Sequence, residues 1–122
     1  MTIAAAMKMG RAMPGVEQST TWGAPALKLR GKMIACQAIN KAAEPNTLVV
    51  RVPFPQRDEL IAADPNTYYL KPHYEDYPCV LVRLSRVHPD ALRDLLRIGW
   101  EFTSAGTARK RTRPAAKRTA RA

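Results

Sequence analysis

The chain has 122 residues, of which 46% are hydrophobic, and it carries a formal net charge of +10. This length fits one domain that can bury a modest core without disulfides. Apolar runs stay well short of the roughly eighteen residues of a transmembrane helix, which excludes a protein that spans a membrane by such helices. The apolar N-terminus has no basic stretch ahead of it and predicts a first helix instead of a signal peptide.

The first elements in chain order are a helix and a loop. Thr2 can cap the helix, and apolar residues then recur at helical spacing as far as Met13. Pro14 and Gly15 end it. The following segment has serine and threonine at 19–21, and we expect it to be a loop.

Five later segments have the composition of β-strands. In chain order they are Ala26–Arg30, Lys32–Ile39, Thr47–Val52, Thr67–Lys71 and Cys79–Ser85. Gly31 separates the first two and predicts a tight hairpin. A short helix over Gln56–Ala63 and a last helix from Pro89 complete the order α-β-β-β-α-β-β-α. The short connections predict an α+β fold, an antiparallel sheet of about five strands with helices packed on one face.

Periodicity also predicts which residues form the core. Residues of one strand face and of one helix stripe should be buried together. These residues are Leu29, Val50, Val82, Leu92, Leu95 and Leu96. Cys36 and Cys79 lie inside apolar strands and form no CxxC, so we expect two buried free thiols in a reducing cytoplasm.

Several motifs of the chain occur in an order known from one family. They are Pro14-Gly15-Val16-Glu17, Trp22-Gly23-Ala24-Pro25, the strand-like run from Ala26 to Lys32, and the segment from Tyr68 to Leu84. Together these runs, over roughly Ile3 to Phe102, resemble the MmcQ/YjbR family of small bacterial proteins. The resemblance implies a frataxin-like (CyaY-like) α+β fold and DNA binding through a double-wing motif. The first helix has no Asp or Glu, so the iron chemistry of frataxin is not carried over.

Strand alternation predicts a basic sheet face opposite the helices. Lys28, Arg30, Arg51 and Arg83 should share it, and such a face can follow phosphates. The alternative is that these side chains only solvate the open face of an antiparallel sheet.

The sequence predicts a domain over residues 1–102 and a disordered basic tail over residues 103–122. The tail holds seven of the twenty basic residues and no acid, so the body carries only +3 of the net charge. Its cations are Arg109, Lys110, Arg111, Arg113, Lys117, Arg118 and Arg121. They suit an arm that lies along DNA without reading its sequence, and the alternative is a solubilising terminus.

Four aromatic residues form a second candidate site, for a ligand or for base stacking. They are Trp22, His73, Tyr74 and Tyr77. His73 could act as a general acid or base, or it could hydrogen-bond the backbone of its loop while the tyrosines close the end of the sheet. A nucleophile, metal-ligand set or phosphate loop at a recognised spacing is missing, so we predict no catalytic residue, metal or cofactor.

The expected function is non-enzymatic, largely sequence-independent DNA binding by a monomeric cytoplasmic protein without membrane or metal partners. The alternative is a protein-interaction or small-ligand module that uses the region of Trp22, His73 and Tyr74.

Overall fold

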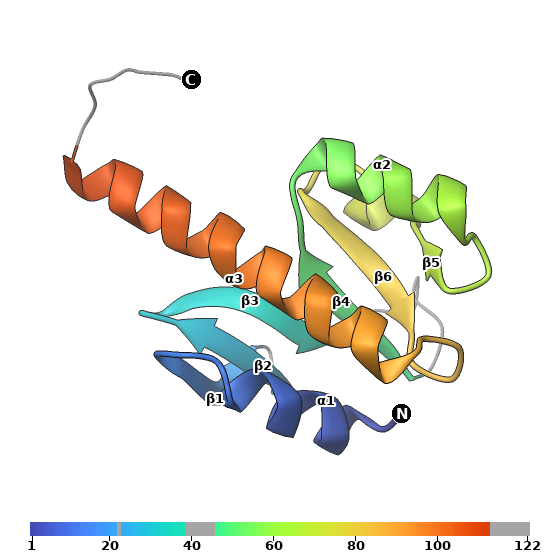
Figure 1. The fold of residues 1–122 in the computed structure, drawn as a ribbon, viewed down its shortest axis with the longest axis horizontal. Coiled ribbons are helices and arrows are strands. Elements are labelled where there is room, and N and C mark those ends of the chain that lie inside the picture. The colour runs from blue at the N-terminus through green and yellow to red at the C-terminus, as the bar shows by residue number, and fades with distance from the viewer. Residues whose placement is uncertain (22, 39–45, 113–122) are drawn as a thin grey trace.

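The computed structural model describes the backbone of residues 1–21, 23–38 and 46–112, with side chains except at Thr21, His73 and residues 106–112. Over this range the α+β prediction is confirmed (Figure 1). The elements are α1 (Ile3–Arg11), β1 (Val16–Thr21), β2 (Ala24–Leu29), β3 (Lys32–Gln37), β4 (Thr47–Arg51), α2 (Phe54–Ala63), β5 (Tyr68–Tyr69), the 3-10 turn η1 (Pro72–Tyr74), β6 (Cys79–Arg83) and α3 (Pro89–Thr112). The strands form one antiparallel sheet in the order β1-β2-β3-β4-β6-β5.

The sheet contains a strand that the sequence did not predict. The segment expected to be a loop is β1, which pairs with β2 from Val16 opposite Leu29 to Thr21 opposite Ala24. Val16 is buried and the next four residues are exposed, so β1 is an edge strand with little apolar signal. Pairing with β2, and not its own hydrophobic pattern, makes this segment a strand.

The predicted hairpin between the next two strands is confirmed. Leu29 of β2 pairs with Lys32 of β3, so the turn consists of Arg30 and Gly31. Both turn residues have positive φ, 52° and 80°, as in the two-residue turns that match the twist of antiparallel strands. Arg30 therefore belongs to the turn and not to the strand.

Helix α1 forms as its sequence predicts. The Thr2 side chain accepts a hydrogen bond from the backbone N–H of Ala5 at 3.0 Å, which satisfies one of the free donors of the first turn. Ala6 and Met7 face the sheet. The helix ends at Arg11, shortly before Pro14 and Gly15.

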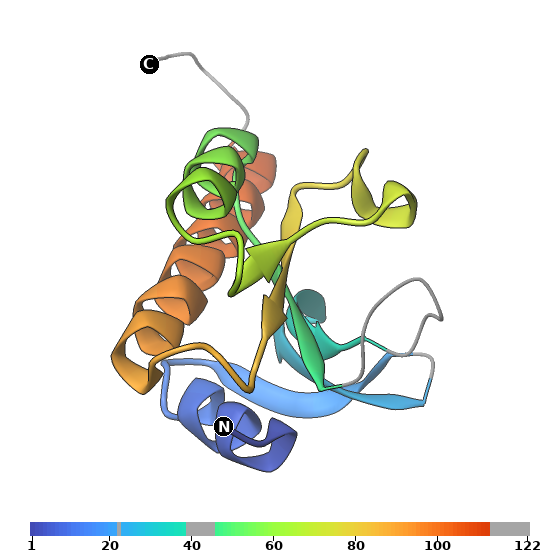
Figure 2. The ribbon, with the colours of Figure 1, turned by 90° about the vertical axis from the view of Figure 1, so that its right-hand side faces the viewer.

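All three helices pack on the same face of the sheet (Figures 1 and 2). The main core contains residues of α1, α3 and all six strands, and Leu60 and Ile61 of α2 pack against it. The predicted core residues Leu29, Val50, Val82, Leu92, Leu95 and Leu96 are all buried in this one cluster. The core prediction is therefore confirmed.

The opposite face of the sheet carries a second apolar cluster. Its buried members are Ala26, Cys36, Val49, Tyr69, Cys79 and Leu81, with Tyr74 packed against them. The connection from β5 to β6 projects on this side, away from the helices (Figure 2). We expected this face to be open and basic. The connection from β5 to β6 covers part of it, and the residues at its centre are apolar.

Helix α3 continues past the predicted domain boundary at Phe102. Its backbone is helical to Thr112, and Thr103 is only 3% exposed. Adding residues to a formed helix is cheap, and the alanine, lysine and arginine residues of 103–112 are good helix formers. This segment continues α3 instead of starting a separate tail, and residues 113–122 lie outside the described residues.

Close packing of α3 on the sheet leads to a first prediction. A β-carbon at Gly99 would lie 2.9 Å from the backbone oxygen of Arg51 and 3.1 Å from the Ile34 side chain. Replacing Gly99 with Val should lower the free energy of unfolding by about 2 kcal/mol, because backbone cannot yield as a side-chain tip can. Urea denaturation measures the loss. The matched control is Ala105→Val on an exposed position of α3, which should cost only about 0.6 kcal/mol in helix propensity. Equal losses for the two variants would contradict the close approach.

Candidate functional site

The four cations predicted to share the sheet face lie in three separate places. Lys28 and Arg30 lie on the β2–β3 hairpin, Lys28 half-buried and Arg30 exposed. Arg51 and Arg83 are half-buried and lie at opposite ends of the paired strands β4 and β6, because these strands are antiparallel. The structure therefore does not gather the four into one surface.

Arg83 holds a loop in place. Its guanidinium donates to the backbone oxygens of Pro65 at 3.1 Å and Asn66 at 3.0 Å, and lies 4.2 Å from the centre of the Tyr69 ring. The Tyr69 hydroxyl in turn shares a buried 2.7 Å hydrogen bond with the Thr47 hydroxyl. A guanidinium used in this way ties the turn before β5 to the sheet and has few donors left for a phosphate.

Arg51 is likewise occupied within the body. It is the cross-strand neighbour of Cys79, a member of the second apolar cluster. Its side chain therefore leaves β4 on the face opposite the main core, as predicted. Its guanidinium nevertheless lies 4.9 Å from the centre of the Phe102 ring on α3. This cation–π contact joins the end of β4 to α3.

The β2–β3 hairpin carries the exposed part of the predicted basic face. Arg30 is exposed at the turn, with Lys28 at the end of β2 and Lys32 at the start of β3. Glu17 on β1 is the cross-strand neighbour of Lys28. Patterns within single strands do not predict this acidic neighbour. Three cations and one acid leave this hairpin net basic.

The predicted aromatic group is divided by the structure. Tyr74, the last residue of η1, is half-buried against the second apolar cluster, and burial raises the pKa of its hydroxyl. Tyr77 is 59% exposed. Trp22 and the His73 side chain lie outside the described residues, so the proposed ligand site at Trp22, His73 and Tyr74 stays a prediction.

All seven predicted C-terminal cations lie where no side chain is described. Arg109, Lys110 and Arg111 belong to the α3 backbone, and Arg113, Lys117, Arg118 and Arg121 lie beyond it.

Charge is distributed unevenly along the fold. Residues 54–78 contain two basic and five acidic residues, a net charge of −3, so the rest of the chain carries +13. In Figure 1 the β2–β3 turn and the C-terminal half of α3 extend toward the same end of the long axis, whereas α2 and β5 lie toward the other. The molecule therefore has a basic end and a more acidic end.

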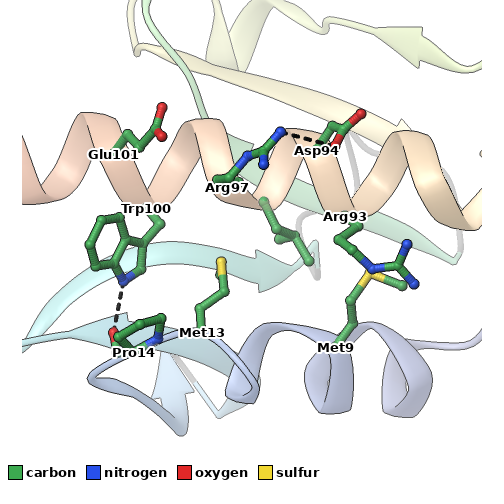
Figure 3. A pocket seen from close by; sticks show the side chains of 9 residues that line it. Met9, Met13, Pro14, Arg93, Asp94, Arg97, Trp100 and Glu101 are labelled. Carbon is green, nitrogen blue, oxygen red and sulfur yellow. Dashed lines mark hydrogen bonds and ion pairs between the residues drawn. The ribbon is translucent and has the colours of Figure 1, made fainter.

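A groove between α1 and α3 was not predicted (Figure 3). It has a volume of about 310 Å³ and is lined by Met9 of α1 and by Met13, just beyond the end of α1, on one side and by Arg93 and Trp100 of α3 on the other. The Trp100 indole N–H donates to the backbone oxygen of Pro14 at 2.8 Å, so the ring closes the joint between the helices. At its rim Arg97 pairs with Asp94 at 3.2 Å. The groove is apolar, and its rim carries two basic and two acidic residues, Arg93, Arg97, Asp94 and Glu101. The sequence does not predict a groove between residues so far apart in the chain.

The two cysteines are buried free thiols, as predicted. Burial raises the pKa of Cys36 to about 11, and burial also raises that of Cys79 to about 11 although Arg57 and Arg51 lower it. Neutral, buried thiols are poor nucleophiles and metal ligands. Among the described residues, no three His, Cys, Asp or Glu side chains gather as a metal site would require. Within the same range, no helix has the length and apolar character to cross a membrane.

Comparison with known proteins identifies relatives by sequence and by fold. The family model YjbR matches residues 11–102. Uncharacterized proteins from Mycobacterium bovis and Mycobacterium tuberculosis are 42% identical over 41 residues, which cover 34% of this chain and only 32% of theirs. The crystal structure of Deinococcus radiodurans protein DR2400, with family-model domain DUF419, superposes with a TM-score of 0.71 and 21% identity, covering 90% of this chain and 86% of that one. That likeness concerns the fold alone.

The contacts of Arg83 predict a structural effect. Replacing Arg83 with Met should lower the free energy of unfolding by about 1–2 kcal/mol, because the backbone oxygens of Pro65 and Asn66 lose a charged hydrogen-bond donor. Chemical denaturation followed by circular dichroism measures this loss. Arg86→Met, at an exposed position nearby, is the matched control and should change stability by less than about 0.5 kcal/mol. If Arg83→Met lost no more stability than the control, Arg83 would not have this structural role.

The thiols give a prediction that depends on pH. At pH 8 a thiol of ordinary pKa is about one-tenth ionised, whereas one with a pKa of about 11 is about one-thousandth ionised. Iodoacetamide should therefore alkylate Cys36 and Cys79 at least about a hundredfold more slowly in the folded protein than in denaturant. Their contribution to stability is complete below pH 9 and is lost as the pH rises through about 11, because the unfolded thiols ionise first. Mass spectrometry follows the alkylation, and equal rates in both states would show that the thiols are accessible.

Proposed function

The chain belongs to the YjbR family, and we propose that it binds DNA without catalysing a reaction, through phosphate contacts at its basic end. The observation that carries the proposal is the exposed, net basic β2–β3 hairpin at the same end of the molecule as the C-terminal half of α3. A duplex offers a dense row of phosphates, and cations on two neighbouring elements can neutralise several of them together.

The conformation of Arg30 supports a role for the hairpin turn. Its φ of 52° lies in the left-handed region, where Asn or Gly is preferred and an arginine costs about 1 kcal/mol. Such a residue persists where the surrounding structure imposes the conformation, and this is frequent at binding sites. The strain presents a long cation at the tip of the hairpin.

The C-terminal sequence supports the same function. Residues 103–122 contain seven basic residues and no acid, and they follow directly from the last buried turns of α3. Contacts of this kind involve phosphates and not base edges, so the affinity should depend little on sequence.

The proposal predicts how binding depends on salt. Each neutralised phosphate adds about −0.9 to the slope of log affinity against log salt concentration. Removing residues 113–122, which leaves α3 intact, should flatten the slope by about 2–4 units, since four cations are lost. The variant Lys28→Ala/Arg30→Ala should flatten it by about 1–2 units. Fluorescence anisotropy with a random duplex at several salt concentrations measures the slopes.

The matched control removes two cations elsewhere. Arg93 and Arg97 form ion pairs with Asp90 and Asp94 at exposed positions of α3, so Arg93→Gln/Arg97→Gln should leave the slope within experimental error. Equal flattening by the control would mean that only total charge matters. An absence of binding at low salt by the full chain would remove the proposal.

A further inference from the structure

Two large apolar side chains are exposed at the acidic end of the molecule. Among the residues with described side chains, the exposed large hydrophobics are Phe54 at 42% and Tyr77 at 59%. Phe54 begins α2, and Tyr77 lies in the connection between η1 and β6. They come from two different segments of the chain, and both segments contact Arg57.

Arg57 holds the two segments together. Its Nη1 donates to the backbone oxygens of Glu75 at 2.9 Å and Tyr77 at 3.3 Å, and its guanidinium lies 4.7 Å from the centre of the Phe54 ring. The Arg57 side chain is only 13% exposed and also pairs with Asp58 at 3.1 Å. The aromatic rings therefore project from a backbone that is tied in place.

Carboxylates lie on the same two segments as these rings. Asp58, Glu75 and Asp76 are all exposed, and with Arg57 they give the surface a net charge of −2. We call these residues, with Phe54 and Tyr77, the aromatic–acidic face. A negative surface repels phosphates, so stacking of nucleic acid bases on Tyr77, one of the sequence-based expectations, is disfavoured here.

We propose that the aromatic–acidic face docks a basic, arginine-rich peptide segment of a partner protein. Guanidinium groups stack on exposed aromatic rings and pair with carboxylates. The face offers both kinds of group, and Phe54 remains 42% exposed beside Arg57. Its charge is complementary to such a peptide although the whole chain is strongly basic. The site is separate from the basic end, so it does not depend on the proposed DNA binding.

Amide chemical shifts of the full chain can test this proposal. The probe is a synthetic peptide of about ten residues that alternates arginine and alanine, and the matched probe replaces every arginine with glutamate. The arginine peptide should shift the amide signals of Phe54, Arg57 and Tyr77, and the glutamate peptide should not. An absence of these shifts with the arginine peptide overturns the proposal. Shifts of the same signals by single-stranded oligothymidine would assign the face to nucleic acid and also overturn it.

Variants separate the specific site from general charge. Phe54→Ala/Tyr77→Ala and Glu75→Lys/Asp76→Lys should each weaken binding of the arginine peptide about fivefold or more, the first by removing the rings and the second by reversing charge. Glu17→Lys/Glu101→Lys changes the net charge by the same amount as the second variant at exposed sites elsewhere. This control should stay within about twofold of the unaltered chain. Equal weakening by the control would show that only net charge matters. Circular dichroism confirms that each variant is folded.

Discussion

The close approach of α3 to β3 and β4 is the constraint on which the rest of the structure depends. Gly99 permits it, because any β-carbon there would meet the backbone of Arg51. The leucines of α3 can then fill the space above the sheet, and Trp100 reaches the Pro14 carbonyl to hold the joint with α1. One helix thus packs against both the N-terminal helix and the central strands.

The arginines of the body serve largely as internal ties. Arg51, Arg57 and Arg83 each place a guanidinium against an aromatic ring, and the last two also bind backbone carbonyls of loops. The planar guanidinium can stack on a ring while its N–H groups donate in the same plane, a geometry that a lysine ammonium lacks. The net charge of +10 therefore overstates how many cations face a partner.

Local sequence patterns predicted the fold well. The candidate site was predicted less well, because it depends on contacts between residues that are far apart in the sequence. Alternation identified the core face of β4 and β6 correctly, because side-chain direction depends only on neighbouring residues. The strand β1 was missed since Val16 is its buried anchor and its threonines resemble a loop. The role of Arg83 depends on carbonyls 17 and 18 residues away, and the Trp100 bond on a residue 86 positions away. Such pairs leave no periodic trace in the sequence.

The uneven distribution of charge gives the molecule an electric dipole. A polyanion would attract the hairpin and the C-terminal half of α3 and repel the segment 54–78, so the field would rotate the protein before any contact forms. The basic end of the molecule would then meet the polyanion first, which would raise the fraction of collisions that lead to binding. The trailing end, where α2 lies, would remain turned toward the solvent and accessible to a third molecule.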